Sequence, residues 1–214
     1  MAVRQARRRG WVRRAVGDVE QVDVGDYRAI FALPGNVEGY PGGVDDAAKA
    51  LRSRTSSWSL EQALPRDVFT ADATLAALSG DGSRERLYPL EAATALAAIL
   101  RQRGLVAMVA DGGEFEGERS PADPSGMLGY YVVALFDDGA DAPTRYVDPW
   151  GGRAAATPDP VRVLRDTEVV AAALGIQAAR SFSSSGNAQT ALPMIETALR
   201  LDSVSPTLRS THAV

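Results

Sequence analysis

GYYVVALFDDGADAPTRYVDPWGG, residues 129–152, is the stretch that decides how the rest of the chain is interpreted. The run from Tyr130 to Phe136 is too short for an isolated helix and is rich in aromatic and β-branched residues, which predicts a strand buried on both faces. Aspartate, glycine and proline residues then provide turn chemistry before a second short strand that ends at Asp148. The stretch therefore predicts a β-hairpin with Asp148 at its open end.

The segment before the hairpin predicts a helix and a further strand. Pro89 suits the first turn of a helix, apolar residues recur at helical spacing as far as Leu100, and Gly104 follows the basic last turn, so a helix is expected over 89–103. Residues 105–110 then predict a strand. The order of helix, strand, long loop and hairpin indicates an α+β fold, in which the helix packs on a small antiparallel sheet.

The first part of the chain predicts only small elements. We expect an edge strand over 19–24 and short helices over 26–33, 46–52 and 70–78, with Asp45 as the N-cap of the helix over 46–52. Residues 1–17 form a basic arm, which either contacts acidic lipid or nucleic acid or remains a solvated terminus. The second interpretation is favoured, because chain termini are usually solvated.

Composition excludes several classes of function. A formal net charge of -4 gives no basic field for nucleic acid, and the longest apolar helix candidate, 92–100, is too short to span a bilayer. The absence of cysteine excludes disulfides, thiolate metal sites and cysteine nucleophiles. No apolar signal segment follows the N-terminal arginines, which predicts a cytoplasmic protein. With 214 residues, of which 45% are hydrophobic, one substantial core is expected.

The loop over 111–125 is acidic, which is a feature of cation sites. It carries five carboxylates between glycines and prolines, and carboxylates are the ligands of hard cations. Their spacing matches no calcium-binding loop, and acidic residues are common in solvated loops. The sequence therefore predicts neither a metal site nor a cofactor.

The chain becomes helical after Pro160. A helix over 167–183 with Asp166 as its N-cap, a break at Gly186-Asn187, a helix over 188–201 and a third helix from Pro206 are expected. Pro193 should kink the second helix or delay its start. The expected organisation is an α+β core over 18–160 and a helical segment over 161–214, which is expected to be truncated because the chain stops inside a candidate helix.

The order of elements resembles the core of papain-like and transglutaminase-like enzymes. Those enzymes place a cysteine at the start of the helix, a histidine at the start of the next strand and an aspartate on the strand after it. Carried onto this sequence, the three positions fall on or next to Pro89, on Tyr130 and on Asp148. The resemblance therefore implies a degenerate triad, since only the aspartate is retained. The sole histidine, His212, lies near the C-terminus, and tyrosine is a poor base at neutral pH.

Three motifs carry a closer resemblance, which covers roughly residues 85–214. They are YPLE at 88–91, running into RQRGL at 101–105; GYYVV at 129–133; and YVDPWGG at 146–152. Together they resemble the bacterial invasion-regulator family, which combines a transglutaminase-like core with a tetratricopeptide tail. That family often lacks the catalytic cysteine, and Tyr130 stands where it commonly has histidine.

The C-terminal segment resembles the same family independently. Its small and apolar residues have the spacing of a tetratricopeptide repeat, with a closing Leu-Arg-Leu-Asp at 199–202; they are Gly186, Ala191, Ile195 and Ala198. One repeat cannot form a solenoid alone. The hairpin is therefore expected to pack on the core or against another chain.

The first functional hypothesis is a non-catalytic transglutaminase-like module with a regulatory or protein-interaction role. Its protein partner would bind through the helical tail, or through a groove formed by Tyr130, Asp148 and Trp150. A structural interpretation of these residues stays open beside it. Asp148 can accept hydrogen bonds from turn amides, and Trp150 can anchor the turn in the core.

The alternative is a hydrolase or acyl transferase with a rebuilt, cysteine-free active site. Such a site would use Tyr130 or Tyr131 together with Asp148 and a loop serine, Ser120 or Ser125. Serine is common in loops, so the presence of these residues does not by itself indicate catalysis. No residue is assigned as catalytic on this basis.

Overall fold

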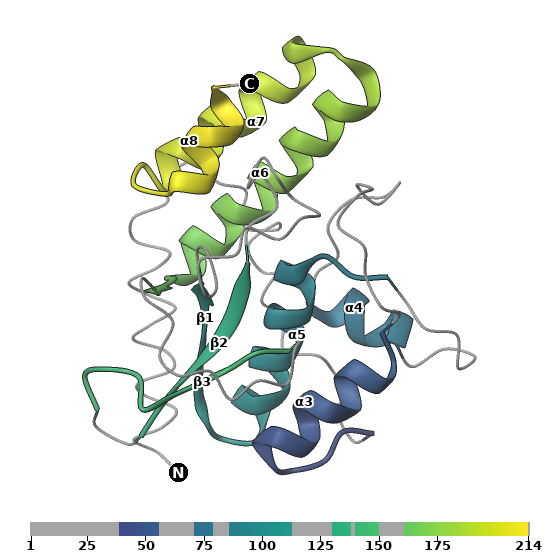
Figure 1. Cartoon of the computed structure of the whole chain (residues 1–214), viewed down its shortest axis with the longest axis vertical. Coiled ribbons are helices and arrows are strands. Elements are labelled where there is room, and N and C mark those ends of the chain that lie inside the picture. Colours follow the sequence, from purple (N-terminus) through teal and green to yellow (C-terminus); the bar gives the residue numbers. More distant parts are fainter. Residues whose placement is uncertain are drawn as a thin grey trace.

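A computed structural model of the chain describes residues 39–55, 71–78, 86–112, 130–137, 140–149 and 161–213. Within these ranges the chain forms helices and one small antiparallel sheet, so the expected α+β class is confirmed (Figure 1). In chain order the elements are α3 (Val44–Ser53), α4 (Ala71–Leu78), α5 (Pro89–Gln102), β1 (Val106–Asp111), β2 (Tyr131–Phe136), β3 (Arg145–Val147), β4 (Arg162–Val163), α6 (Asp166–Ser185), α7 (Ala188–Leu201) and α8 (Pro206–His212).

The sheet has the strand order β3-β2-β1-β4, and each neighbouring pair is antiparallel. β1 and β2 pair along their whole length, and beyond β1 the Gly112 amide donates to the Tyr130 carbonyl oxygen (2.7 Å). This hydrogen bond shows which residues of β1 direct their amides and carbonyls toward β2. Even-numbered residues of β1 bond to β2, and odd-numbered residues direct their amides and carbonyls toward β4.

The central strand β2 is buried on both faces, as its composition predicts. Its odd-numbered side chains belong to the main apolar cluster, whereas Val132 and Ala134 pack on the opposite face of the sheet. β3 follows and pairs with β2, with Val147 opposite Val133. The predicted hairpin is therefore confirmed, and Asp148 follows directly after β3.

Helix α5 forms the centre of the main apolar cluster, where it packs on β1 and β2 and also on α3 and α4 (Figure 1). All residues from Pro89 to Leu100 are buried, including Glu91. The Glu91 Oε2 atom accepts a hydrogen bond from the Tyr88 amide (2.8 Å), one of the donors that a helix N-terminus leaves unpaired. At the other end Gly104 has a φ of 85°, a left-handed conformation that favours glycine.

The edge strand β4 is only two residues long and was not predicted. It pairs with the last residues of β1, and the Leu164 amide donates to the Val109 carbonyl (2.9 Å). The Ala107 carbonyl instead accepts a hydrogen bond from Arg101 Nε (2.6 Å). A strand of two residues shows no alternation of apolar and polar residues, so the sequence pattern contains no signal for it.

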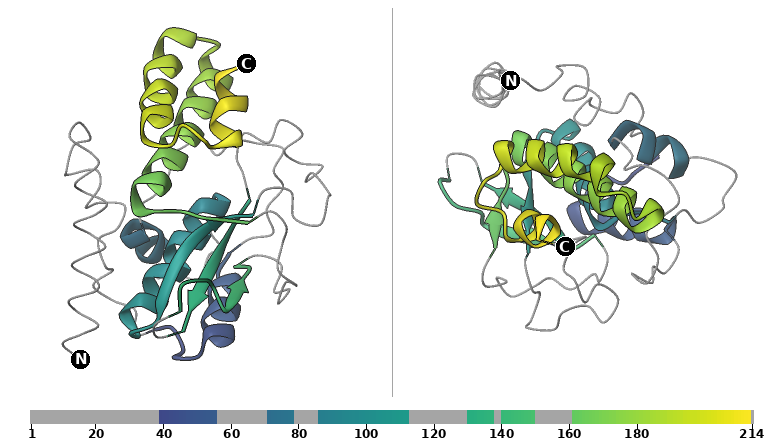
Figure 2. Two further views of the ribbon diagram at one scale, coloured as in Figure 1. Left: turned by 90° about the vertical axis from the view of Figure 1, so that its left-hand side faces the viewer. Right: turned by 90° about the horizontal axis from the view of Figure 1, so that it is seen from above.

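Helix α6 follows the sheet and forms a helical hairpin with α7, after which α8 completes the chain's helical segment (Figures 1 and 2). Val169 and Ile176 of α6 pack in the main cluster, while another face of the helix packs against α7 and α8. Gly186 ends α6 with a φ of 64°, and the Asn187 side chain caps α7 by accepting from the Gln189 amide (2.9 Å). The expected break at Gly186-Asn187 is confirmed.

The predicted N-caps of α3 and α6 are wrong. Asp45 and Asp166 lie inside the first turns of these helices, and the N-cap positions belong to Gly43 and Arg165. An acidic residue in the first turn stabilises the helix through the macrodipole without capping it. An aspartate in such a position therefore locates the N-terminus of the helix to within a residue or two, but it does not identify the N-cap residue.

The remaining expectations have mixed outcomes. α7 begins at Ala188 and continues through Pro193, so the proline does not delay its start. The elements expected over 19–24 and 26–33 lie outside the described residues. Among the helices that the structure describes, none is both long and apolar enough to cross a membrane.

Candidate functional site

The structure brings the three predicted triad positions to the same end of the sheet. α5 joins β1 through a tight turn and packs along β1 and β2, so Pro89, its first residue, lies toward the end of β1. Tyr130 directly precedes β2 and Asp148 directly follows β3, and the strand register puts both at that end. Pro89 is buried and Asp148 is only 3% exposed, so these positions belong to the packed interior.

The two adjacent tyrosines lie on opposite faces of the sheet. Tyr131 is buried in the cluster around α5, whereas the half-buried Tyr130 packs with Ala110 and Val132 on the other face. Tyr131 is therefore the aromatic residue on the α5 side, although the resemblance had pointed to Tyr130. A shift of one residue along a strand reverses the face, and a pair of identical residues gives the sequence no means of choosing between them.

A row of polar side chains crosses the sheet at this end. Asp111, the last residue of β1, lies opposite Tyr131 of β2 and opposite Arg162 of β4. Side chains on neighbouring strands at such positions are about 5 Å apart at their Cβ atoms. Because Asp111 is buried, its carboxylate depends on these neighbours for compensation of its charge. The row links the end of the α+β core to the start of the helical segment.

Arg162 is the centre of the charges at this end. Its Nη1 and Nη2 atoms donate to the two carboxylate oxygens of Asp202 (3.1 and 2.5 Å), and Nη1 lies 3.3 Å from Glu168 Oε1. Glu168 also accepts from the Arg165 amide (2.5 Å) and from Arg165 Nη2 (3.2 Å). Asp202 follows the last turn of α7, and Glu168 lies in the first turn of α6. One guanidinium therefore joins β4, α6 and the turn after α7.

The protonation of Arg162 follows from this environment. Burial acts to lower the pKa of its guanidinium, but the hydrogen bond and charge of Asp202 act in the opposite direction. The charges of Glu168 and Asp111 add to the second effect, and the resulting pKa of Arg162 lies above its ordinary value. A group that is always charged cannot act as a general acid or base near neutral pH. The arrangement holds charge in place and does not transfer protons through Arg162.

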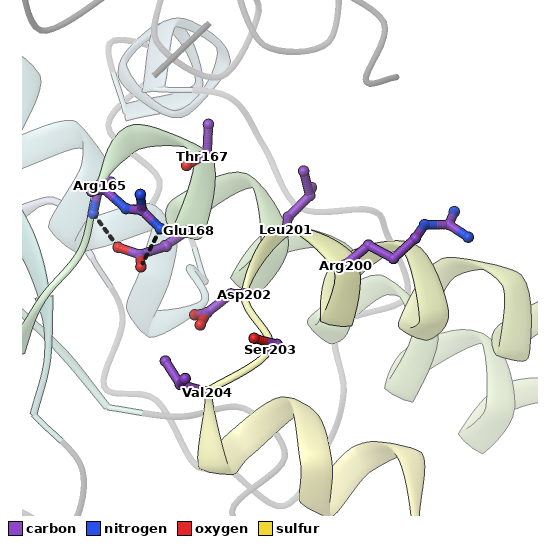
Figure 3. Close-up of a pocket in the computed structure, with 8 residues that line it drawn as sticks. All are labelled: Arg165, Thr167, Glu168, Arg200, Leu201, Asp202, Ser203 and Val204. Carbon is purple, nitrogen blue, oxygen red and sulfur yellow. Dashed lines mark hydrogen bonds and ion pairs between the residues drawn. The ribbon is translucent and has the colours of Figure 1, made fainter. Parts of the chain in front are cut away.

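An open cleft of about 270 Å³ lies between the start of α6 and the end of α7 (Figure 3). In Figure 3 the side chains of Arg165 and Glu168 point toward one another, whereas Arg200 extends away from them. Guanidinium groups bind both carboxylates of the cleft, Glu168 and Asp202, so neither is positioned as a free general base. The lining residues are Arg165, Thr167, Glu168, Arg200, Leu201, Asp202, Ser203 and Val204.

The structure does not place every candidate residue of the sequence. Trp150, Ser120 and Ser125 lie outside the described residues, so their proposed roles stay predictions. His212 is exposed on α8. Within the part of the chain that the structure describes, no group of three or more histidine, cysteine, aspartate or glutamate side chains is placed to hold a metal ion.

The ion network around Arg162 was not predicted from the sequence. Arg162 follows two prolines in a stretch expected to connect the core with the helices, and nothing local indicates that it enters the sheet. The available signal was Glu168, three residues after the N-cap Arg165, which is the spacing of a capping box. That signal identifies the helix start but not the partners of the arginine.

Comparison with known proteins gives no further assignment. No family model, curated protein or solved structure matches the chain. The α+β architecture therefore rests on the structure alone.

Proposed function

We propose that the chain is a non-catalytic protein-interaction or regulatory module with a transglutaminase-like core. The observation that carries this proposal is that Pro89 is the first residue of α5, where such enzymes hold their nucleophile, in a chain without cysteine. A proline side chain has no nucleophilic atom. The single histidine belongs to α8 instead of β2, so the general base of such a site is missing as well.

The element order and the tail support the same proposal. α5, β1, β2 and β3 follow one another as the helix, strand and hairpin of a transglutaminase-like core do, and α6 with α7 forms a helical hairpin. Together with the YVDPWGG motif at 146–152, this order favours the invasion-regulator family. The proposed protein partner binds in the cytoplasm through the helical tail or the groove near Trp150.

The helical tail offers a specific contact to test. Leu192 on α7 and Val204 after α7 are large apolar residues that are 43% and 60% exposed. Isolated apolar residues on a surface are common, so exposure alone does not establish an interface. Leu105, before β1, is 39% exposed and provides a matched position on the core.

The first experiment tests catalysis. We expect purified protein to show no turnover of amide, ester or isopeptide substrates above that of an Asp148→Asn variant with the same circular dichroism spectrum. Turnover that Asp148→Asn abolishes without loss of structure would overturn the proposal and favour the alternative of a hydrolase or acyl transferase.

The second experiment tests partner binding. We expect cross-linking in the native cells to recover the same proteins with the unmodified chain and with Leu105→Glu, and to lose them with Leu192→Glu. The direct contact is then measured with the purified partner, for which Leu192→Glu should weaken binding by roughly tenfold or more, as expected for loss of an apolar contact. Equal binding by the two variants would exclude the exposed face of α7.

A further inference from the structure

The apolar cluster that holds α7 and α8 on α6 is small. Four of its six buried members are alanines, whose side chains bury little apolar area. α8 contributes a single buried apolar residue, Leu208. The buried members are Ala171, Ala178, Ala191, Ile195, Ala198 and Leu208, with partly buried residues packed around them. Apolar packing alone therefore holds α7 and α8 less firmly than it holds α5.

Two features of the backbone weaken this unit further. Pro193 lies inside α7 and has no amide hydrogen, so α7 lacks one of its internal hydrogen bonds. α8 spans only 206–212, and an isolated helix of that length is unstable in water. Both helices therefore depend on their contacts with other elements.

An ion pair connects this unit to the sheet. Both carboxylate oxygens of Asp202 bind Arg162. The side chain of Asp202 is 2% exposed and that of Arg162 is 30% exposed. Charge-assisted bidentate contacts of this kind are among the stronger hydrogen bonds in proteins. Arg162 is itself held by β4 and by Glu168 of α6, so it provides a fixed attachment for Asp202.

We propose that α7 and α8 form a latched flap, which opens from α6 as one unit while the core stays folded, and that the Arg162–Asp202 ion pair is the latch. The part of α6 from Val169 to Ile176 stays in place because both of these side chains are packed in the main cluster. Opening uncovers the face of α6 that carries Ala171 and Ala178. It also separates the two walls of the cleft in Figure 3. Opening can be measured without any partner.

Native-state hydrogen exchange of the full chain tests the flap. Under conditions where exchange reports the opening equilibrium, amides of α7 and α8 should share one opening constant, larger than that of α5 and β2. Asp202→Asn should raise this constant about tenfold, because it removes the charge that binds Arg162. The amides of α5 and β2 should keep their protection.

The matched control makes the same chemical change at an exposed ion pair. Asp45 of α3 binds Arg145 of β3, and the side chain of Asp45 is 73% exposed. Asp45→Asn should leave exchange in α7 and α8 unchanged. Exchange of α7 and α8 only together with α5 and β2 would overturn the proposal, as would equal effects of the two substitutions on α7 and α8.

Discussion

At the scale of single residues, Glu91 shows how a buried carboxylate is stabilised at a helix start. It is fully buried, and its Oε2 atom accepts the Tyr88 amide (2.8 Å). Glu91→Ala leaves that amide without its acceptor and creates a cavity, so the free energy of unfolding in urea should fall by about 2–4 kcal/mol. Glu91→Gln keeps an acceptor oxygen and should cost less. Equal losses for the two variants would show that this hydrogen bond is not the source of the stabilisation.

The residues of the candidate site were predicted unequally. Asp148 and Pro89 lie at the predicted ends of their elements, since turn residues and a first-turn proline mark such ends in the sequence. The sequence did not distinguish Tyr130 from Tyr131, and it gave no partner for Arg162. Those outcomes depend on strand register and on contacts between distant segments, which local patterns do not contain.

At the scale of elements, the contact between α6 and α8 depends on a glycine. A Cβ atom at Gly175 would lie 2.3 Å from Leu208 Cδ2, closer than two carbon atoms that are not bonded to one another can approach. Gly175→Ala should therefore lower the free energy of unfolding by about 1–3 kcal/mol through overpacking. In a Leu208→Ala background the same substitution should raise the free energy of unfolding by about 1 kcal/mol, because alanine favours the helix more than glycine does.

Urea denaturation of the unmodified chain, the two single variants and the double variant measures whether the effect of Gly175→Ala on the free energy of unfolding changes sign. A stabilising effect of Gly175→Ala in both backgrounds would contradict the close contact with Leu208 and would show that helix propensity dominates. Circular dichroism of each variant checks that the helical content is retained.

Long elements with clear periodicity were the best predicted. α5, α7 and the hairpin of β2 and β3 appear within one or two residues of their expected limits, because periodicity, glycine and proline all act locally. β4 and the N-caps of α3 and α6 were missed or misplaced. In each of these cases the outcome was decided by packing or by a single backbone conformation and not by a repeated pattern.

At the scale of the whole molecule, Arg101 joins three elements. Its Nε atom donates to the Ala107 carbonyl of β1 (2.6 Å), and its Nη2 atom lies 3.2 Å from Asp166 Oδ1 at the start of α6. The register of β1 and β4 would next pair residue 107 with residue 166, where the chain has already turned into a helix. The Arg101 guanidinium therefore gives the Ala107 carbonyl the hydrogen bond that a longer β4 would have supplied.

Arg101→Met should lower the free energy of unfolding by about 2–4 kcal/mol, because it leaves the Ala107 carbonyl and Asp166 without this partner in a mostly buried site. Arg145→Met removes an exposed ion pair with Asp45 and should change the free energy of unfolding by less than about 1 kcal/mol. Urea denaturation of both variants gives the comparison. Similar losses in the two would show that Arg101 is no more than a surface ion-pair residue.

The position of β4 has a consequence for how the chain is made. β4 pairs with β1, although the whole β2–β3 hairpin separates them in sequence. A chain emerging from the ribosome can form α5, β1 and the hairpin early, but the odd-numbered edge of β1 stays without this partner until 162–164 are synthesised. Closure of this distant pair, and not formation of the hairpin, is therefore expected to set the rate at which the sheet is completed.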